Sequence, residues 1–117
     1  MIALKTFAKF ANIKLTDFNP KPTTKTPGQV EASDILWESD DGKTKIGIWE
    51  CTKGTFTADR TGAAEFCHIL SGKASITNYD GNGQRVMAGG DLLVLPKGWK
   101  GEWTIYEKVK KLFIIQQ

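Results

Sequence analysis

Short apolar runs separated by turn-forming residues occupy the chain from residue 35 onward. Their spacing predicts β-strands, and no stretch carries the longer apolar period of an extended helix. The strands are expected at 35–37, 45–49, 55–57, 66–70, 74–79, 84–87, 91–95, 102–106 and 110–116. Short strands with frequent turns are typical of a β-sandwich or a β-barrel. The fold is therefore predicted to be all-β.

Glycine, asparagine and aspartate mark the turns between these strands. Residues 40–43 (Asp-Asp-Gly-Lys) and 80–83 (Asp-Gly-Asn-Gly) are predicted to be turns, because asparagine and glycine tolerate positive φ. The pair at 71–72 (Ser-Gly) is predicted to form a two-residue hairpin loop. Residues 66–70 and 74–79 would then be two separate strands.

The N-terminal part of the chain has a different pattern. Residues 1–11 mix apolar side chains with lysines in a spacing that suits either a short helix or an edge strand. Residues 19–28 contain three prolines and a glycine, which oppose regular structure. We therefore expect residues 1–30 to form an extended arm that is no independent domain, and residues 31–117 to form the barrel.

Net charge separates the arm from the rest of the chain. Residues 1–30 contain five lysines and one aspartate, a net charge of +4, whereas the remaining residues have eleven bases and twelve acids. A nucleic-acid-binding domain normally clusters its basic residues on the folded body. The balanced body therefore argues against nucleic-acid binding.

Membrane and secretory features are not expected. No apolar run approaches the roughly 18 residues of a membrane span, and residues 1–9 lack the long apolar centre of a signal peptide. The expected location is the cytoplasm. In that reducing compartment Cys51 and Cys67, each inside an apolar strand pattern, are expected to be buried free thiols.

Two glycine-bounded motifs organise the predicted barrel. In the first, six residues separate Glu65 from Gly72; in the second, five residues separate Gly90 from Pro96, and Gly98 follows. These spacings resemble the two signature motifs of the cupin superfamily. Together with the neighbouring sequence around Trp49-Glu50-Cys51, they resemble the small single-domain DUF861 (Cupin_3) cupins, which are related to ureidoglycine aminohydrolase and to ethanolamine-utilisation cupins. The resemblance implies an RmlC-like jelly-roll barrel.

The resemblance also implies where metal ligands would lie. Metal-binding cupins present two histidines and a glutamate from the first motif and one histidine from the second. Glu65 occupies the glutamate position. The histidine positions hold other residues: Ala58 and Arg60, or Asp59 and Thr61 if the spacing is one shorter, and Gly101. We therefore predict no metal and no other cofactor.

The single histidine does not replace these ligands. Side chains alternate between the two faces of a strand, so Glu65 and Cys67 share one face while His68 lies on the other. His68 is predicted to lie on the outer face of the barrel or at a subunit contact.

The remaining candidates point to a cavity without metal. Arg60 could pair with Glu65 and supply positive charge for an anionic ligand, with Glu65 as a candidate base. The same pair could instead be structural and close a cavity that has lost its role. Trp49, Trp99 and Trp103 are expected to line the site or to fill it, and an indole could occupy the space left by Gly101.

Three functions remain open from the sequence. The first is a metal-independent protein that binds a small, anionic molecule in the barrel through Arg60, Glu65 and the tryptophans. The second is a cupin enzyme resembling ureidoglycine aminohydrolase, and the third is a structural or regulatory dimer. A homodimer is expected because strand 66–70 is apolar on both faces.

Overall fold

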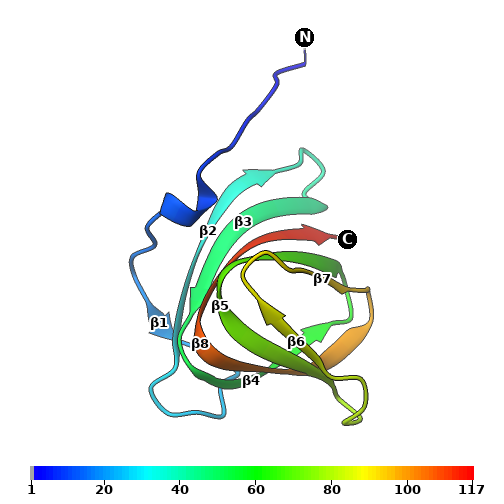
Figure 1. Cartoon of the computed structure of the whole chain (residues 1–117). Coiled ribbons are helices and arrows are strands. Elements are labelled where there is room, and N and C mark those ends of the chain that lie inside the picture. The colour runs from blue at the N-terminus through cyan, green and yellow to red at the C-terminus, as the bar shows by residue number, and fades with distance from the viewer. Residues whose placement is uncertain (1) are drawn as a thin grey trace.

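The computed structural model describes residues 2–117, and these form one antiparallel β-structure (Figure 1). Met1, the first residue of the predicted arm, lies outside the described residues. The elements are η1 (Phe10–Asn12), β1 (Asn19–Pro20), β2 (Val30–Glu38), β3 (Thr44–Cys51), β4 (Gly54–Arg60), β5 (Ala64–Asn78), β6 (Arg85–Ala88), β7 (Leu92–Leu95) and β8 (Trp99–Gln116). The sheet order is β1-β2-β3-β8-β5-β6, with β4 paired to β8 and β7 paired to β5. The predicted all-β jelly-roll fold is confirmed.

Two long strands, β5 and β8, connect the sheet. The strand β8 pairs with β4 through residues 99–105, with β3 through residues 109–116, and with β5 along most of its length. Both strands curve strongly, so the sheet bends around an interior lined by one face of each strand (Figure 1). The predicted strands 102–106 and 110–116 are thus parts of one strand.

The predicted hairpin loop at 71–72 is wrong, because β5 runs unbroken through it. The register of β5 against β8 shifts at three places between Ile69 and Ala74, which marks β-bulges. Bulges bend a strand without ending it. Gly72 has φ +94° and lies against the backbone of Lys108 and Val109. Glycine is therefore required here for a bend and a close strand approach.

The other two predicted turns are confirmed. In the β2–β3 turn the amide of Gly42 donates to the carbonyl of Ser39, and in the β5–β6 turn the amide of Gly81 donates to the carbonyl of Asn78. Gly42 and Gly81 both have positive φ, as a tight turn of this kind requires.

The N-terminal arm is partly tied to the barrel. Residues 2–9 form neither the helix nor the strand that their pattern allowed, and the one helical element is η1. Lys110 Nζ donates to the carbonyls of Ala11, at 3.0 Å, and of Ile13. The proline-rich stretch is more regular than expected, since Asn19 and Pro20 pair with β2. Proline is tolerated there because β1 is an edge strand.

Aromatic and aliphatic side chains fill the interior. The rings of Trp49, Phe56 and Trp103 pack together, with Phe56 and Trp103 stacked at 6.0 Å between ring centroids. Cys67, Ile69 and the inward residues of β8 complete this core. Among residues 2–117, no helix has the length and hydropathy needed to cross a membrane.

Candidate functional site

A cavity of about 200 Å³ lies next to the aromatic core. Its lining residues are Lys21, Glu31, Ser33, Trp49, Phe56, Arg60, Glu65, Trp103, Lys111, Phe113 and Ile115. They come from the arm and from strands β2, β3, β4, β5 and β8. The alternation of side chains along the strands explains which residues line the cavity, because each strand directs every second residue inward.

Glu65 is the central charged group of the cavity wall. Its side chain is almost completely buried. Each carboxylate oxygen accepts a hydrogen bond from a cation: Arg60 Nε lies 2.7 Å from Oε1, and Lys111 Nζ lies 3.0 Å from Oε2. A buried carboxylate without such partners would be strongly unfavourable. The predicted pairing of Arg60 with Glu65 is present in the structure.

Lys111 is the most buried of the charged site residues that the sequence analysis missed, the others being Lys21 and Glu31. Its ammonium group lies 4.3 Å from the centre of the Trp49 ring and 4.6 Å from that of Trp103, in addition to its ion pair with Glu65. These distances are typical of cation–π interactions. Lys111 shares a strand face with the buried Val109 and Phe113. The sequence signal that could have identified Lys111 as an inward-facing residue is its place between two apolar residues, Val109 and Phe113, at alternate positions of the strand.

The ion pairs hold Glu65 in its charged form. Burial by itself raises the pKa of Glu65, but the positive charges of Lys111 and Arg60 and their hydrogen bonds outweigh burial and lower that pKa from 4.5 to about 2.

We expect this depressed pKa to make the free energy of unfolding depend on pH. A carboxyl whose pKa is lower in the folded state stabilises the fold above its unfolded pKa, and that contribution is lost as pH falls from about 5 to about 2. Urea unfolding of the wild type and of Glu65→Gln between about pH 5 and about pH 2 measures this contribution to the free energy of unfolding. The stability difference between the two proteins should shrink as pH falls. A constant difference would contradict the assignment.

The three predicted tryptophans do not share one environment. Trp49 and Trp103 line the cavity, and the indole N–H of Trp49 donates to Glu31 Oε1 at 2.8 Å. Trp99 is not among the lining residues; its indole N–H donates to Asn78 Oδ1 at 2.9 Å. The Trp99 ring covers Gly101 so closely that a Cβ there would lie 3.0 Å from Cε2 and overlap the six-membered ring. An indole therefore fills the space beside Gly101.

The arm contributes one lining residue, Lys21, to the cavity. Lys21 Nζ lies 3.1 Å from Glu31 Oε1 and 4.7 Å from the centre of the Phe56 ring. Glu31 thus forms an ion pair with Lys21 and accepts a hydrogen bond from Trp49. Lys21 lies in the predicted arm, so the cavity is completed by a segment outside the barrel strands.

The groups present do not suit a transition metal. Both carboxylate oxygens of Glu65 are engaged by cations, and a metal ion would be repelled by Arg60 and Lys111. The positions where the cupin resemblance places histidines hold Ala58 and Arg60, or Asp59 and Thr61 if the spacing is one shorter, and Gly101, and none of these residues offers an imidazole. No group of three His, Cys, Asp or Glu side chains within residues 2–117 could hold a metal ion.

The two cysteines are poor nucleophiles. Both are free and fully buried. Burial raises the pKa of Cys51 to about 12 and that of Cys67 to about 11, so both remain protonated at neutral pH.

His68 lies on the outer face, opposite to Glu65, as the alternation of side chains predicts. Its side chain is exposed and lines a shallow surface hollow with Phe66, Leu92, Leu112 and Ile114. Leu92 and the neighbouring Val94 are 67% and 51% exposed. This apolar outer face is where the sequence pattern predicts a subunit contact.

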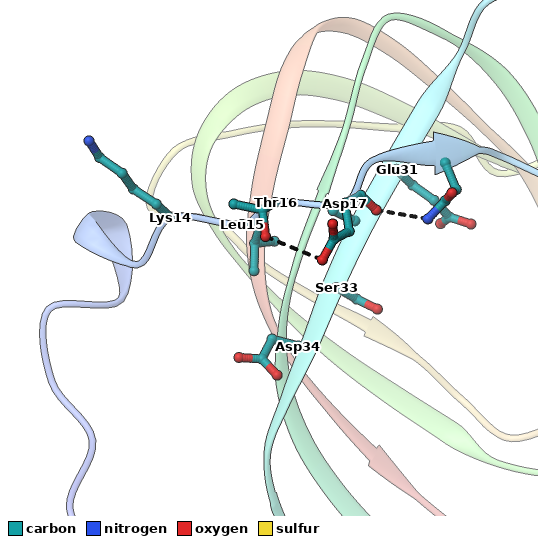
Figure 2. Close-up of a pocket in the computed structure, with 9 residues that line it drawn as sticks. Lys14, Leu15, Thr16, Asp17, Glu31, Ser33 and Asp34 are labelled. Carbon is teal, nitrogen blue, oxygen red and sulfur yellow. Dashed lines mark hydrogen bonds between the residues drawn. The ribbon is translucent and has the colours of Figure 1, made fainter.

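A larger space of about 580 Å³ lies between the arm and the edge of β2 (Figure 2). Residues 14–17 and 19 border it on one side and residues 31–34 on the other. Most of these side chains are polar and exposed, and Asn19 Nδ2 and the hydroxyl of Thr16 bond within the arm. This space lies open along the sheet edge, and it shares the lining residues Glu31 and Ser33 with the cavity at Glu65.

Comparison with known proteins gives a consistent picture. The family model of the EutQ-like cupin domain (Cupin_3) matches residues 38–113, which is more than half of the chain. Among solved structures, the EutQ protein of Clostridium difficile matches with a TM-score of 0.75 at 20% identity, over 92% of this chain and 83% of that chain. No curated protein matches the chain in sequence.

Two further solved structures of related families are similar to this chain. A putative ethanolamine utilization protein Q from Salmonella typhimurium has a TM-score of 0.69 at 19% identity, over 85% of this chain and 77% of its own. A DUF861 family protein from Thermotoga maritima is 36% identical over 56% of this chain and 73% of its own, with a TM-score of 0.53. The family match across the barrel confirms the resemblance of the two motifs, and the chain belongs to the EutQ-like cupin domain family.

Proposed function

We propose that this cupin binds a small anionic molecule in the cavity at Glu65 without a metal ion. The observation that carries the proposal is the charge of the cavity wall. Arg60, Lys111 and Lys21 face two carboxylates, Glu65 and Glu31, which leaves one positive charge in excess. Such an excess in a partly desolvated space favours an anion.

The geometry of Arg60 supports the same ligand class. Its Nε donates to Glu65 and its Nη1 donates to the carbonyl of Asp59, at 2.7 and 3.0 Å. Among residues 2–117, Nη2 donates to no acceptor, so this edge of the guanidinium group is available to a ligand oxygen. Guanidinium groups bind carboxylates and phosphates through paired hydrogen bonds.

The size and lining of the cavity limit the ligand. A volume of about 200 Å³ corresponds to roughly seven water molecules at about 30 Å³ each. Trp49, Phe56 and Trp103 give the rest of the wall an apolar surface. A short organic acid, with one carboxylate at Arg60 and a small apolar remainder against these rings, fits this combination.

Substitution of Arg60 tests the proposal. We expect pyruvate, malonate or inorganic phosphate to raise the melting temperature of the wild type and to give a binding isotherm by calorimetry. Arg60→Gln should weaken that binding at least tenfold, because a charge-assisted hydrogen bond contributes about 1.5–3 kcal/mol. Circular dichroism checks that the variant is folded.

Arg85 provides the matched control. It is the only other arginine, it is exposed on β6, and its Nη1 donates to the carbonyl of Gln84. Arg85→Gln should bind the anions as the wild type does. Equal binding by Arg60→Gln and the wild type, or no binding of any of the three anions to the wild type, would refute the proposed function.

The structure favours binding over general-base catalysis by Glu65. A general base works best when its pKa lies near the working pH. The pKa of Glu65 is about 2, because Lys111 and Arg60 overcome the effect of burial. Glu65 therefore serves in this proposal to orient Arg60 and Lys111.

A further inference from the structure

A groove lies on the outer face of the sheet, where β4, β8 and β5 pair side by side. Its volume is about 470 Å³. The lining residues are 57–59 of β4, 100–102 of β8, 77–79 and 81 at the end of β5, and Thr23 of the arm. None of them lines the cavity at Glu65. This groove, called the Tyr79 groove below, is therefore a separate candidate site.

Strand pairing places polar side chains in two rows across the Tyr79 groove. In the first row Thr57 is opposite Glu102, which is opposite Thr77 on its other side. In the second row Asp59 is opposite Lys100. The residues that precede the two threonines belong to the buried core, so the alternation of side chains directs both threonines outward.

Tyr79 ends the second row with an aromatic ring that is 80% exposed. Its backbone amide donates to the carbonyl of Lys100 at 3.0 Å. The preceding residue, Asn78, is held as well, because its carbonyl accepts from the amide of Gly81 and its Oδ1 accepts from the indole N–H of Trp99. The backbone beside the ring is thus fixed. An exposed tyrosine in such a place offers a ligand a large apolar face and one hydroxyl.

The hydroxyl groups of the Tyr79 groove keep their hydrogen-bonding capacity. Among residues 2–117, the hydroxyls of Thr57, Thr77 and Tyr79 form no hydrogen bond. In the next row of the same face, by contrast, the hydroxyls of Thr55 and Thr104 bond to each other at 3.1 Å. The three free hydroxyls face water, and the hydroxyls of a ligand can take the place of that water.

The charged groups of the Tyr79 groove balance one another. Oδ1 of Asp59 accepts from the hydroxyl and the amide of Thr61, and these bonds lower the pKa of Asp59 and keep it charged. Its Oδ2 lies 4.0 Å from Lys100 Nζ and accepts no hydrogen bond within the described chain. Glu102 is paired with Lys25, which reaches over from the arm. Two acids therefore face two lysines, and no net charge remains.

We propose that the Tyr79 groove binds a neutral oligosaccharide. The ring of Tyr79 stacks on the apolar face of one sugar ring, and the sugar hydroxyls bond to Asp59 and to the hydroxyls of Thr57 and Thr77. A ligand that is uncharged and rich in hydroxyls suits a surface with one exposed aromatic ring, balanced charges and free polar groups. The inference does not depend on the cavity at Glu65 or on its ligand.

Titration with maltotriose, cellotriose and triacetylchitotriose tests the proposal. At least one of these sugars should bind the wild type by calorimetry, and the amide resonances that shift in NMR spectra should belong to residues 57–59, 77–81 and 100–102. Tyr79→Ala should weaken this binding about tenfold, because the ring supplies the largest apolar contact. Thr57→Val keeps the shape of the side chain and should weaken binding about fivefold, because one neutral hydrogen bond is lost.

Tyr106→Ala provides the matched control. Tyr106 is the only other tyrosine, is 46% exposed on β8 and lies outside the Tyr79 groove, where its hydroxyl bonds to that of Ser75. Once circular dichroism shows that it is folded, this variant should bind the sugar as the wild type does. Failure of all three sugars to bind the wild type would overturn the proposal. So would equal binding by Tyr79→Ala, an equal loss in Tyr106→Ala, or shifted resonances gathered around Glu65 instead.

Discussion

Replacing Lys111 with methionine is expected to reduce the free energy of unfolding by about 3–5 kcal/mol, the usual loss when one partner of a buried ion pair is removed. The variant keeps a long apolar side chain between Trp49 and Trp103 but leaves Glu65 with Arg60 alone. Urea unfolding at pH 7 measures the loss. Lys100→Met, at an exposed lysine 4.0 Å from Asp59, should change stability by less than about 0.5 kcal/mol.

A second substitution separates the charge from the packing. In Lys111→Met with Glu65→Gln, the buried carboxylate is gone, so at least half of the lost stability should return. If the double variant is as unstable as the sum of the two single variants, the loss comes from packing of the lysine chain. The Lys111–Glu65 ion pair would then contribute little to the stability of the fold.

Replacing Gly72 with alanine is expected to cost more than about 3 kcal/mol. Positive φ alone costs a side chain about 1–2 kcal/mol. At φ +94° the added Cβ would also overlap the carbonyl oxygen of Lys108 and lie 2.7 Å from the Cα of Val109. Both atoms belong to the backbone of β8 and cannot turn aside, so the two strands must separate. Chemical denaturation of the variant measures this cost.

Gly90 provides a control with nearly the same φ. Its φ is +98°, but a Cβ there meets no atom within 4 Å. Gly90→Ala should therefore cost only the conformational part, about 1–2 kcal/mol. Equal losses in the two variants would mean that the approach of β5 to β8 at Gly72 does not constrain the fold.

The two motifs made the fold predictable, and they also made one of the two ion pairs of Glu65 predictable, the pair with Arg60. The interval from Glu65 to Gly72 and that from Gly90 to Gly98 identified the cupin barrel, and the spacing of the first motif placed Arg60 beside Glu65. These residues are close in the chain, so their relation depends on local geometry. Alternation predicted that Glu65 and His68 lie on opposite faces of the strand, and the resemblance of the first motif predicted that the face of Glu65 is the inner one.

Features that depend on long-range register could not be predicted in the same way. Lys111 reaches Glu65 from a strand 46 residues away, and nothing near Glu65 in the sequence marks it. The Ser-Gly pair at 71–72 has the composition of a hairpin loop, yet β8 pairs on both sides of it and keeps β5 continuous. The sequence left open whether Trp99 lines the cavity or fills the space at Gly101; in the structure its ring covers Gly101 and its indole N–H donates to Asn78.

The length of β8 has a consequence for how the protein folds. Because β8 pairs with β3, β4 and β5, no neighbouring pair of earlier strands can close the interior before it arrives. Such sequence-distant pairings require long loops to be ordered first, which slows folding. The cavity wall draws on the arm and on five strands, so it exists only when the whole chain is folded. A ligand bound there therefore opposes global unfolding as well as local motion. Its affinity can be obtained from the increase in the free energy of unfolding of the entire domain.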